Sequence, residues 1–107
     1  MKQRLTQLLE KFKKDILARF PKQIVSLTLF GSQARGDAKK DSDVDILVVT
    51  RSSDWHLGDQ IGEIAYNLLL ETGVYISTKV MSRERYDYLR EIQAPFINNV
   101  SKDGIPL

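Results

Sequence analysis

Residues 24–50, IVSLTLFGSQARGDAKKDSDVDILVVT, contain two β-strand patterns joined by a polar connection. Apolar and polar residues alternate over residues 24–30, and a second alternation covers residues 43–50. Side chains with a period of two point to opposite faces of a sheet, so each stretch is expected to form a strand. The second strand is expected to open with two acids, Asp43 and Asp45.

Two helix patterns flank these strands. Apolar residues recur at helical spacing over residues 2–20, and Pro21 ends the pattern. The same spacing returns over residues 54–72, with Gly73 at the place where a helix commonly ends. Each helix therefore has an apolar stripe, and we expect both stripes to pack on the sheet.

The C-terminal third of the chain predicts one more strand and one more helix. Val74–Met81 is rich in β-branched residues, which favour strands. Ser82 can cap a short helix that continues through Leu89. The tail, residues 95–107, is expected to contain one further helical turn before Gly104.

The order of these elements predicts an α/β (α+β) fold in which helices flank a small mixed β-sheet. With 107 residues, the chain is expected to form one domain over residues 1–107. The absence of cysteine excludes disulfides, thiolate catalysis and cysteine-based zinc sites. Because no apolar stretch has the length of a signal peptide or a membrane span, we expect a cytoplasmic protein without a membrane partner.

The charge of the chain is nearly balanced, with 16 Lys and Arg against 14 Asp and Glu and a net charge of +2. Such a weak overall field argues against direct nucleic-acid binding. Basic residues nevertheless crowd the first helix, at Lys2, Arg4, Lys11, Lys13 and Lys14. A solvated helix face explains them, and a surface for a partner or a nucleic acid is the alternative.

Gly31 and Ser32 directly follow the first strand and predict an anion-binding turn. Glycine permits a tight turn and a close approach of the backbone, and the first N–H groups of a following helical turn are free to bind a phosphate. Ser32 adds a hydroxyl donor. Arg35, one turn later, can point its guanidinium toward the same phosphate oxygens.

Asp43 and Asp45 predict a site for a divalent cation. Residues two apart on a strand project from the same face, with their Cα atoms about 7 Å apart. Both carboxylates can therefore reach one ion. Mg²⁺ prefers oxygen ligands and completes its shell with water and substrate phosphates, which the neighbouring turn would hold.

Each half of this pattern is weak by itself, because glycine-serine turns are common and paired acids also protect edge strands from aggregation. The two halves occur together, with ten residues between Ser32 and Asp43. A phosphate-binding turn beside a cation site is the arrangement that phosphoryl-transfer chemistry needs. The combination therefore favours a nucleotide site.

The same residues resemble a known family. Phe30 to Asp37, followed by Ser42 to Ile46, is similar to the motif of the MNT-type minimal nucleotidyltransferases, which belong to the DNA polymerase beta-like nucleotidyltransferase superfamily. The resemblance extends over nearly the whole chain in element order and length. It implies a nucleotidyltransferase fold and a Mg²⁺-dependent transfer of a nucleoside monophosphate, with AMP from ATP as the expected reaction.

The resemblance also implies roles for single residues. Gly31 and Ser32 are expected to contact nucleotide phosphates, with Arg35 as an additional nucleotide-binding residue. Asp43 and Asp45 are expected to be the catalytic, metal-binding residues. MNT proteins are often paired with a HEPN-domain ribonuclease toxin, and some act as antitoxins by adenylylating a tyrosine of that partner.

One departure from the family pattern concerns catalysis. Superfamily enzymes generally carry a third carboxylate on the next strand, but Val74–Met81 contains no acid. Ser77 or Thr78 is expected near that position, and the nearest acids, Glu71 and Glu84, lie outside the strand. A catalytically weak or inactive nucleotide-binding antitoxin or regulatory subunit, acting by complex formation, is therefore the alternative.

Other residues carry less information. A calcium loop beginning at Asp41 is excluded, because it needs Gly and Glu where this chain has Ile46 and Ser52. The lone histidine, His56, is expected to be a surface or capping residue. Lys39 and Lys40 either screen nucleotide charge or lie in a solvated loop, and the four tyrosines show no spacing of a stacking platform.

Overall fold

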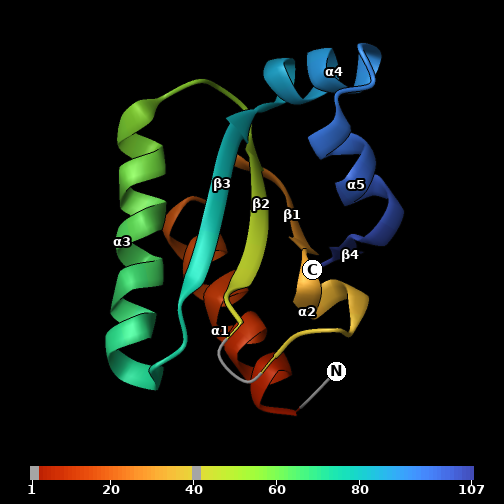
Figure 1. The fold of residues 1–107 in the computed structure, drawn as a ribbon. Helices are drawn as coiled ribbons and strands as arrows, with labels where there is room; N and C mark the ends of the chain where they lie inside the picture. Colours follow the sequence, from red (N-terminus) through yellow and green to blue (C-terminus); the bar gives the residue numbers. More distant parts are fainter. Residues whose placement is uncertain (1–2, 40–41) are drawn as a thin grey trace.

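The protein, described by a computed structural model over residues 3–39 and 42–107, forms a four-stranded sheet with helices on both faces (Figure 1). In chain order the elements are α1 (Gln3–Arg19), β1 (Ile24–Phe30), the short α2 (Ser32–Arg35), β2 (Val44–Thr50), α3 (Trp55–Thr72), β3 (Ile76–Ser82), α4 (Arg83–Glu91), α5 (Pro95–Asp103) and β4 (Ile105–Pro106). No described helix combines the length and the apolar character needed to cross a membrane.

The strands are arranged in the order β3-β2-β1-β4. β1 is antiparallel to both of its neighbours, whereas β2 and β3 are parallel. A parallel pair needs a long crossover connection, and α3 provides it between β2 and β3. The predicted α/β fold with a small mixed sheet is therefore confirmed.

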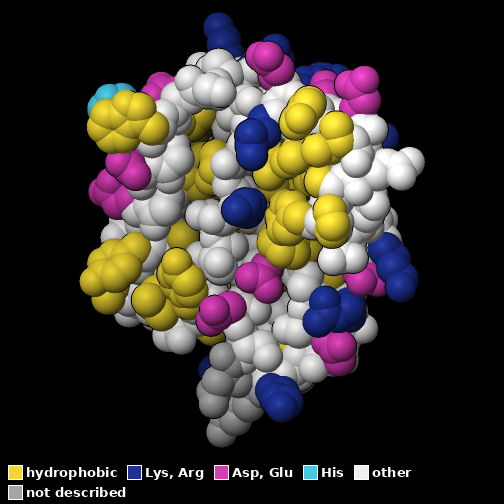
Figure 2. Space-filling model, turned by 45° about the horizontal axis from the view of Figure 1, so that its top comes forward, with side chains coloured by type: hydrophobic (Ala, Val, Ile, Leu, Met, Phe, Trp, Pro, Cys, Tyr) yellow, Lys and Arg dark blue, Asp and Glu magenta, His cyan; other side chains and the backbone are white. Residues whose placement is uncertain are grey.

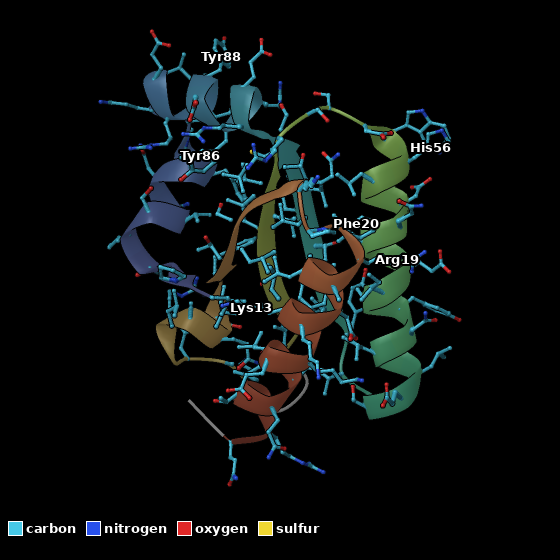
Figure 3. All side chains as sticks on the ribbon, turned by 180° about the vertical axis from the view of Figure 1, so that it is seen from behind. Lys13, Arg19, Phe20, His56, Tyr86 and Tyr88 are labelled. Atoms are coloured by element: carbon cyan, nitrogen blue, oxygen red, sulfur yellow. The ribbon has the colours of Figure 1, made fainter. Side chains whose placement is uncertain are left out.

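α1 and α3 lie together on one face of the sheet (Figure 3). Their apolar stripes bury against side chains that point to this face from β1 and β2, among them Leu29 and Ile46, both 0% exposed. α3 begins after Asp54, whose carboxylate accepts a hydrogen bond of 2.9 Å from the His56 N–H, and ends at Gly73 with a φ of +77°. The helix thus ends at the predicted stop signal, Gly73.

α4 and α5 pack on the opposite face and form a second, smaller core. The side chains of this core are Leu47, Val49, Met81, Ile97 and Val100. Because strand residues alternate, Leu47 and Val49 share their face with Asp45. α4 and α2 lie at opposite ends of the sheet (Figure 1). Asp45 pairs with Phe30, the last residue of β1 before α2, and therefore lies at the end where α2 sits.

The tail differs from its prediction. One helical turn was expected before Gly104, but α5 is nine residues long. β4 then pairs Pro106 with Thr28 and Ile105 with Leu29. A strand of two residues that contains proline has no alternation of apolar and polar residues that could be recognised in the sequence. It becomes visible only through its pairing with β1.

Candidate functional site

Gly31 brings the end of β1 into contact with a side chain of β2. Its φ is +75°, a conformation that glycine adopts at little cost. A Cβ atom at this position would overlap Oδ2 of Asp45 and lie 3.2 Å from its Cγ. The backbone of the predicted phosphate-binding turn and the predicted metal-binding acid therefore converge on one place.

The turn itself is a short helix, α2. The N–H groups of Ala34 and Arg35 both donate to the Gly31 carbonyl oxygen at 3.1 Å, and Gly36 closes the turn on the Ser32 carbonyl at 3.0 Å. The first N–H groups of a helix have no acceptor within the helix, so those of Ser32 and Gln33 are available to a bound anion. This is the geometry that the sequence predicts for a phosphate contact.

Gln33 links the turn to the segment that precedes the acids. Its Nε2 donates to the Ser42 carbonyl oxygen at 3.4 Å. The Ser42 hydroxyl in turn accepts a hydrogen bond of 2.8 Å from the Lys39 N–H. Sequence reasoning assigned no role to Gln33, because a single amide inside a motif has no spacing signal.

The two acids occupy different positions relative to β2. Asp43 is exposed and precedes the strand, which begins one residue later than predicted, whereas Asp45 is half-buried within it. Burial raises the pKa of the Asp45 carboxyl above its ordinary value, and the negative charge of Asp43 raises it further. The positive charge of Arg35 acts in the opposite direction. These three groups are thus close enough to interact electrostatically.

Arg35 lies at the rim of this cluster. Its Nε donates to Oδ2 of Asp37 at 3.2 Å, and the two side chains are 46% and 62% exposed. An exposed pair of this kind contributes little to stability. The guanidinium can therefore exchange Asp37 for a more strongly charged anion.

The two carboxylates fit a divalent cation. They repel each other in its absence, and the missing side chain of Gly31 leaves the Asp45 carboxylate room to reach an ion. Mg²⁺ is commonly held by only one or two carboxylates together with water and phosphate oxygens. Within the described ranges no group of three His, Cys, Asp or Glu residues could hold a metal ion. Among these residues, therefore, no third carboxylate is close enough to Asp43 and Asp45 to share an ion with them.

The register of β3 shows which residue stands at the expected place of a third carboxylate. Ser77 is the partner of Asp45, and paired strand residues share a face. Thr78 pairs with Ile46 and therefore points toward α1 and α3. Glu71 is on that opposite side, where it lines a hollow between α1 and α3, and Glu84 is in the first turn of α4.

The remaining sequence candidates lie apart from the cluster. His56 is at the start of α3, at the end of the sheet opposite α2, and its ring stacks on Trp55 with 3.6 Å between centroids (Figure 3). Tyr86 packs in the smaller core, and Tyr88 is exposed on α4. Lys39 is exposed; Lys2, Lys40 and Asp41 lie outside the described residues.

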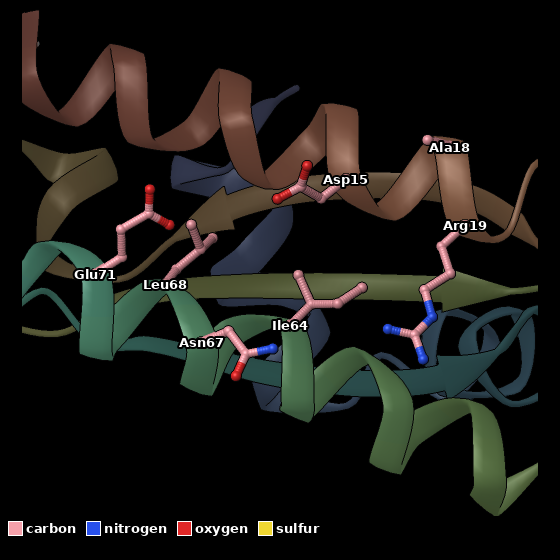
Figure 4. A pocket seen from close by; sticks show the side chains of 7 residues that line it. All are labelled: Asp15, Ala18, Arg19, Ile64, Asn67, Leu68 and Glu71. Carbon is pink, nitrogen blue, oxygen red and sulfur yellow. The ribbon is translucent and has the colours of Figure 1, made fainter.

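Two hollows in the surface do not coincide with the acids. One, of about 430 Å³, lies between α1 and α3 and is lined by Asp15, Arg19 and Glu71, among others (Figure 4). A larger one, of about 1180 Å³, reaches Gln33 and Ser42 from the side of α1. Neither is lined by Gly31, Asp43 or Asp45. Asp43 is exposed, so a second molecule has access to this acid.

The raised pKa of Asp45 predicts a stability gain on its neutralisation. A folded-state pKa above the unfolded value means that folding becomes less favourable as the pH rises through that interval. In metal-free buffer at pH 7, Asp45→Asn is therefore expected to be more stable by about 0.5 kcal/mol, or roughly 2–4 °C in Tm.

This gain should fade as the pH is lowered below about 3, where Asp45 is protonated in the unfolded state as well as in the folded one. Thermal unfolding in EDTA measures it, with Asp59→Asn, an exposed acid on α3, as the control. A lower Tm for Asp45→Asn in EDTA would contradict the assignment of repulsion at this site.

Comparison with known proteins finds a matching family, similar sequences and similar folds. Residues 9–100 match the model of the nucleotidyltransferase domain family. Two proteins of Methanocaldococcus jannaschii, each named "putative protein adenylyltransferase", are similar over nearly the full chain. One is 33% identical over 96 residues, which is 90% of both chains. The other is 30% identical over 102 residues, 94% of this chain and 96% of that protein.

Two solved structures share the fold. The crystal structure of a toxin-antitoxin with AMP-PNP has a TM-score of 0.60 at 20% identity and covers 91% of this chain and 70% of its own. A "putative nucleotidyltransferase" from Sulfolobus solfataricus has a TM-score of 0.56 at 20% identity, with 96% and 78% covered. At this identity the likeness concerns the fold alone.

Proposed function

This chain belongs to the nucleotidyltransferase domain family, and we propose that it transfers AMP from ATP to a hydroxyl group of a partner protein. The resemblance to the MNT-type minimal nucleotidyltransferases is confirmed by the family match and by the relatives named as adenylyltransferases. The main support for the proposal is the contact between Gly31 and Asp45, which brings the turn expected to bind phosphate next to an acid expected to bind metal.

In the proposed reaction the acceptor hydroxyl oxygen forms a bond to the α-phosphorus of ATP. The bond from this phosphorus to the oxygen that bridges to the β-phosphorus breaks, and pyrophosphate leaves with that electron pair. The hydroxyl proton passes to water, since β3 offers Ser77 in place of a carboxylate. A missing general base slows such a reaction by about 10²- to 10⁴-fold, so slow turnover is expected.

Different residues would bind the phosphates and the metal ion. The N–H groups of Ser32 and Gln33 and the Ser32 hydroxyl would hold phosphate oxygens, and Arg35 would add a positive charge at the rim. Asp43 and Asp45 would hold Mg²⁺, which supplies charge neutralisation at the phosphates when it is bound. Positioning and electrostatics of this kind account for most of the catalysis of phosphoryl transfer.

A protein acceptor fits the accessibility of the site. A separate molecule can present the hydroxyl, because Asp43 is exposed and Asp45 is only half-buried. The relatives are named as protein adenylyltransferases, and a protein of the same fold is part of a toxin-antitoxin that was crystallised with AMP-PNP. We therefore propose a toxin partner, of the HEPN type that the sequence resemblance implies, and an antitoxin role.

The alternative is an inactive binding subunit. Ser77 beside Asp45 is its specific support, because a hydroxyl is a weaker metal ligand than a carboxylate and is too weakly basic to accept the proton. In that case the protein would retain ATP binding and neutralise its partner by complex formation.

Transfer of label separates the two functions. The protein is incubated with ATP labelled at the α-phosphate, Mg²⁺ and a HEPN-domain protein encoded beside it. We expect label on the partner and release of pyrophosphate in equal amounts. A tight complex that binds ATP but leaves the partner unlabelled would contradict transfer and favour the inactive subunit.

A further inference from the structure

The face of β3 that carries Ser77 also carries a lysine. Ser77, Lys79 and Met81 alternate with residues that point toward α1 and α3, so Lys79 projects on the same side as Asp45. Its strand partner is Leu47, two residues along β2 from Asp45. Figure 2 shows Lys and Arg side chains near the middle of this face, next to acidic side chains and beside a group of hydrophobic ones.

Aromatic contacts hold the ammonium of Lys79 over the sheet. Its Nζ lies 5.8 Å from the ring centroid of Phe96, the second residue of α5. Phe96 meets Phe30 edge to face, with 5.4 Å between centroids, and Phe30 is the β1 partner of Asp45. The side chain of Lys79 thus leans across Leu47 toward β1, on the face that Phe30 and Asp45 share.

Among the described residues, no acid forms an ion pair with Lys79. In the part of the chain that the structure describes, the ion pairs are Arg35 with Asp37 and Arg83 with Asp87, and Lys79 is in neither. It is also exposed. An exposed ammonium that is in neither of these ion pairs, on the face of the sheet that Asp45 shares, is available to bind an anion.

The site has a specific need for such a charge. A polyphosphate brings several negative charges into the site. Two carboxylates bind fewer metal ions than three, so less of this negative charge is neutralised by metal. Ser77 adds no charge at this place. An ammonium on the same face can supply part of the missing neutralisation without a metal ligand.

We propose that Lys79 is a nucleotide-binding residue whose ammonium binds the polyphosphate. Its positive charge replaces part of the charge of the metal ion that a third carboxylate would help to bind. This inference rests on the proposed function, since it assumes a nucleotide at Gly31 and Asp45. In this proposal β3 contributes a positive charge. A carboxylate on β3 would instead accept the proton of the attacking hydroxyl.

The affinity for ATP tests this role, measured by calorimetry both in EDTA and in Mg²⁺. We expect Lys79→Gln to weaken ATP binding about 10- to 100-fold in both buffers, because a charged hydrogen bond is lost. Lys79→Arg, which keeps the charge, should stay within a few-fold of the wild type. Lys22→Gln, which removes an exposed lysine near the opposite end of β1, should leave the affinity unchanged.

The outcomes separate this inference from the proposed function. Equal affinities for Lys79→Gln and Lys22→Gln, with ATP bound by the wild type, would overturn the role of Lys79 alone. Failure of the wild type to bind ATP in Mg²⁺ would overturn the nucleotide site itself. Because Lys79 is exposed, we expect Lys79→Gln to have nearly the Tm of the wild type. A measured Tm close to that of the wild type would exclude misfolding as the cause of a lower ATP affinity.

Discussion

Replacing Gly31 with alanine is expected to remove nucleotide binding and to lower the stability of the fold. The φ of +75° is unfavourable for any residue with a Cβ, at a cost of about 1–2 kcal/mol. The added methyl group would also overlap the Asp45 carboxylate, so that side chain must move away from the turn. We expect a loss of ATP affinity in Mg²⁺ of about 100-fold or more, equivalent to roughly 3 kcal/mol.

Gly36 provides a matched control for this change. Its φ is +83°, but a Cβ there would meet nothing within 4 Å. Gly36→Ala should therefore retain most of its ATP affinity and lose less free energy of unfolding than Gly31→Ala, because Gly36 is left-handed helical (ψ 10°) whereas the ψ of Gly31, −158°, lies in a region that essentially only glycine adopts. Calorimetry and denaturant unfolding measure the two quantities. If both variants lost the same ATP affinity, backbone strain would explain the result and the contact with Asp45 would have no special role.

Replacing Asp43 with asparagine is expected to abolish measurable transfer while the fold stays intact. Asp43 is exposed and makes no contribution to either core, so its loss should change stability by less than about 0.5 kcal/mol. Without one of two carboxylates the site should hold Mg²⁺ poorly. We expect the rate of label transfer to fall about 1000-fold, equivalent to roughly 4 kcal/mol.

Asp59→Asn is the control, since it removes an exposed acid from α3 on the other side of the sheet. Initial rates of label transfer at saturating ATP and several Mg²⁺ concentrations give the comparison. Activity of Asp43→Asn equal to that of Asp59→Asn would show that transfer does not depend on the paired acids.

The sequence predicts the centre of the fold well, because the signals there are local. The two alternations around Gly31 and Asp45 are continuous in the chain, and the hairpin that they form brings its ends together. The pairing of Phe30 with Asp45 follows from that hairpin. A motif confined to one supersecondary unit can therefore be recognised from spacing alone.

Long-range features escape such reasoning. The choice between Ser77 and Thr78 depends on the register of two strands separated by α3, and a shift of one residue reverses every side chain. β4 is defined only by its pairing with β1, and the contact of Lys79 with Phe96 depends on how α5 docks. These relations have no signature within a short window of residues.

The central claim is that the turn at Gly31 and the acids at Asp43 and Asp45 bind one ligand together. Calorimetric titration of ATP into the wild type and Asp43→Asn, each with and without Mg²⁺, tests it most directly. We predict that Mg²⁺ raises the ATP affinity of the wild type at least about tenfold, a coupling of roughly 1.4 kcal/mol, and that this gain disappears in Asp43→Asn. An ATP affinity of the wild type that is the same with and without Mg²⁺ would contradict the account.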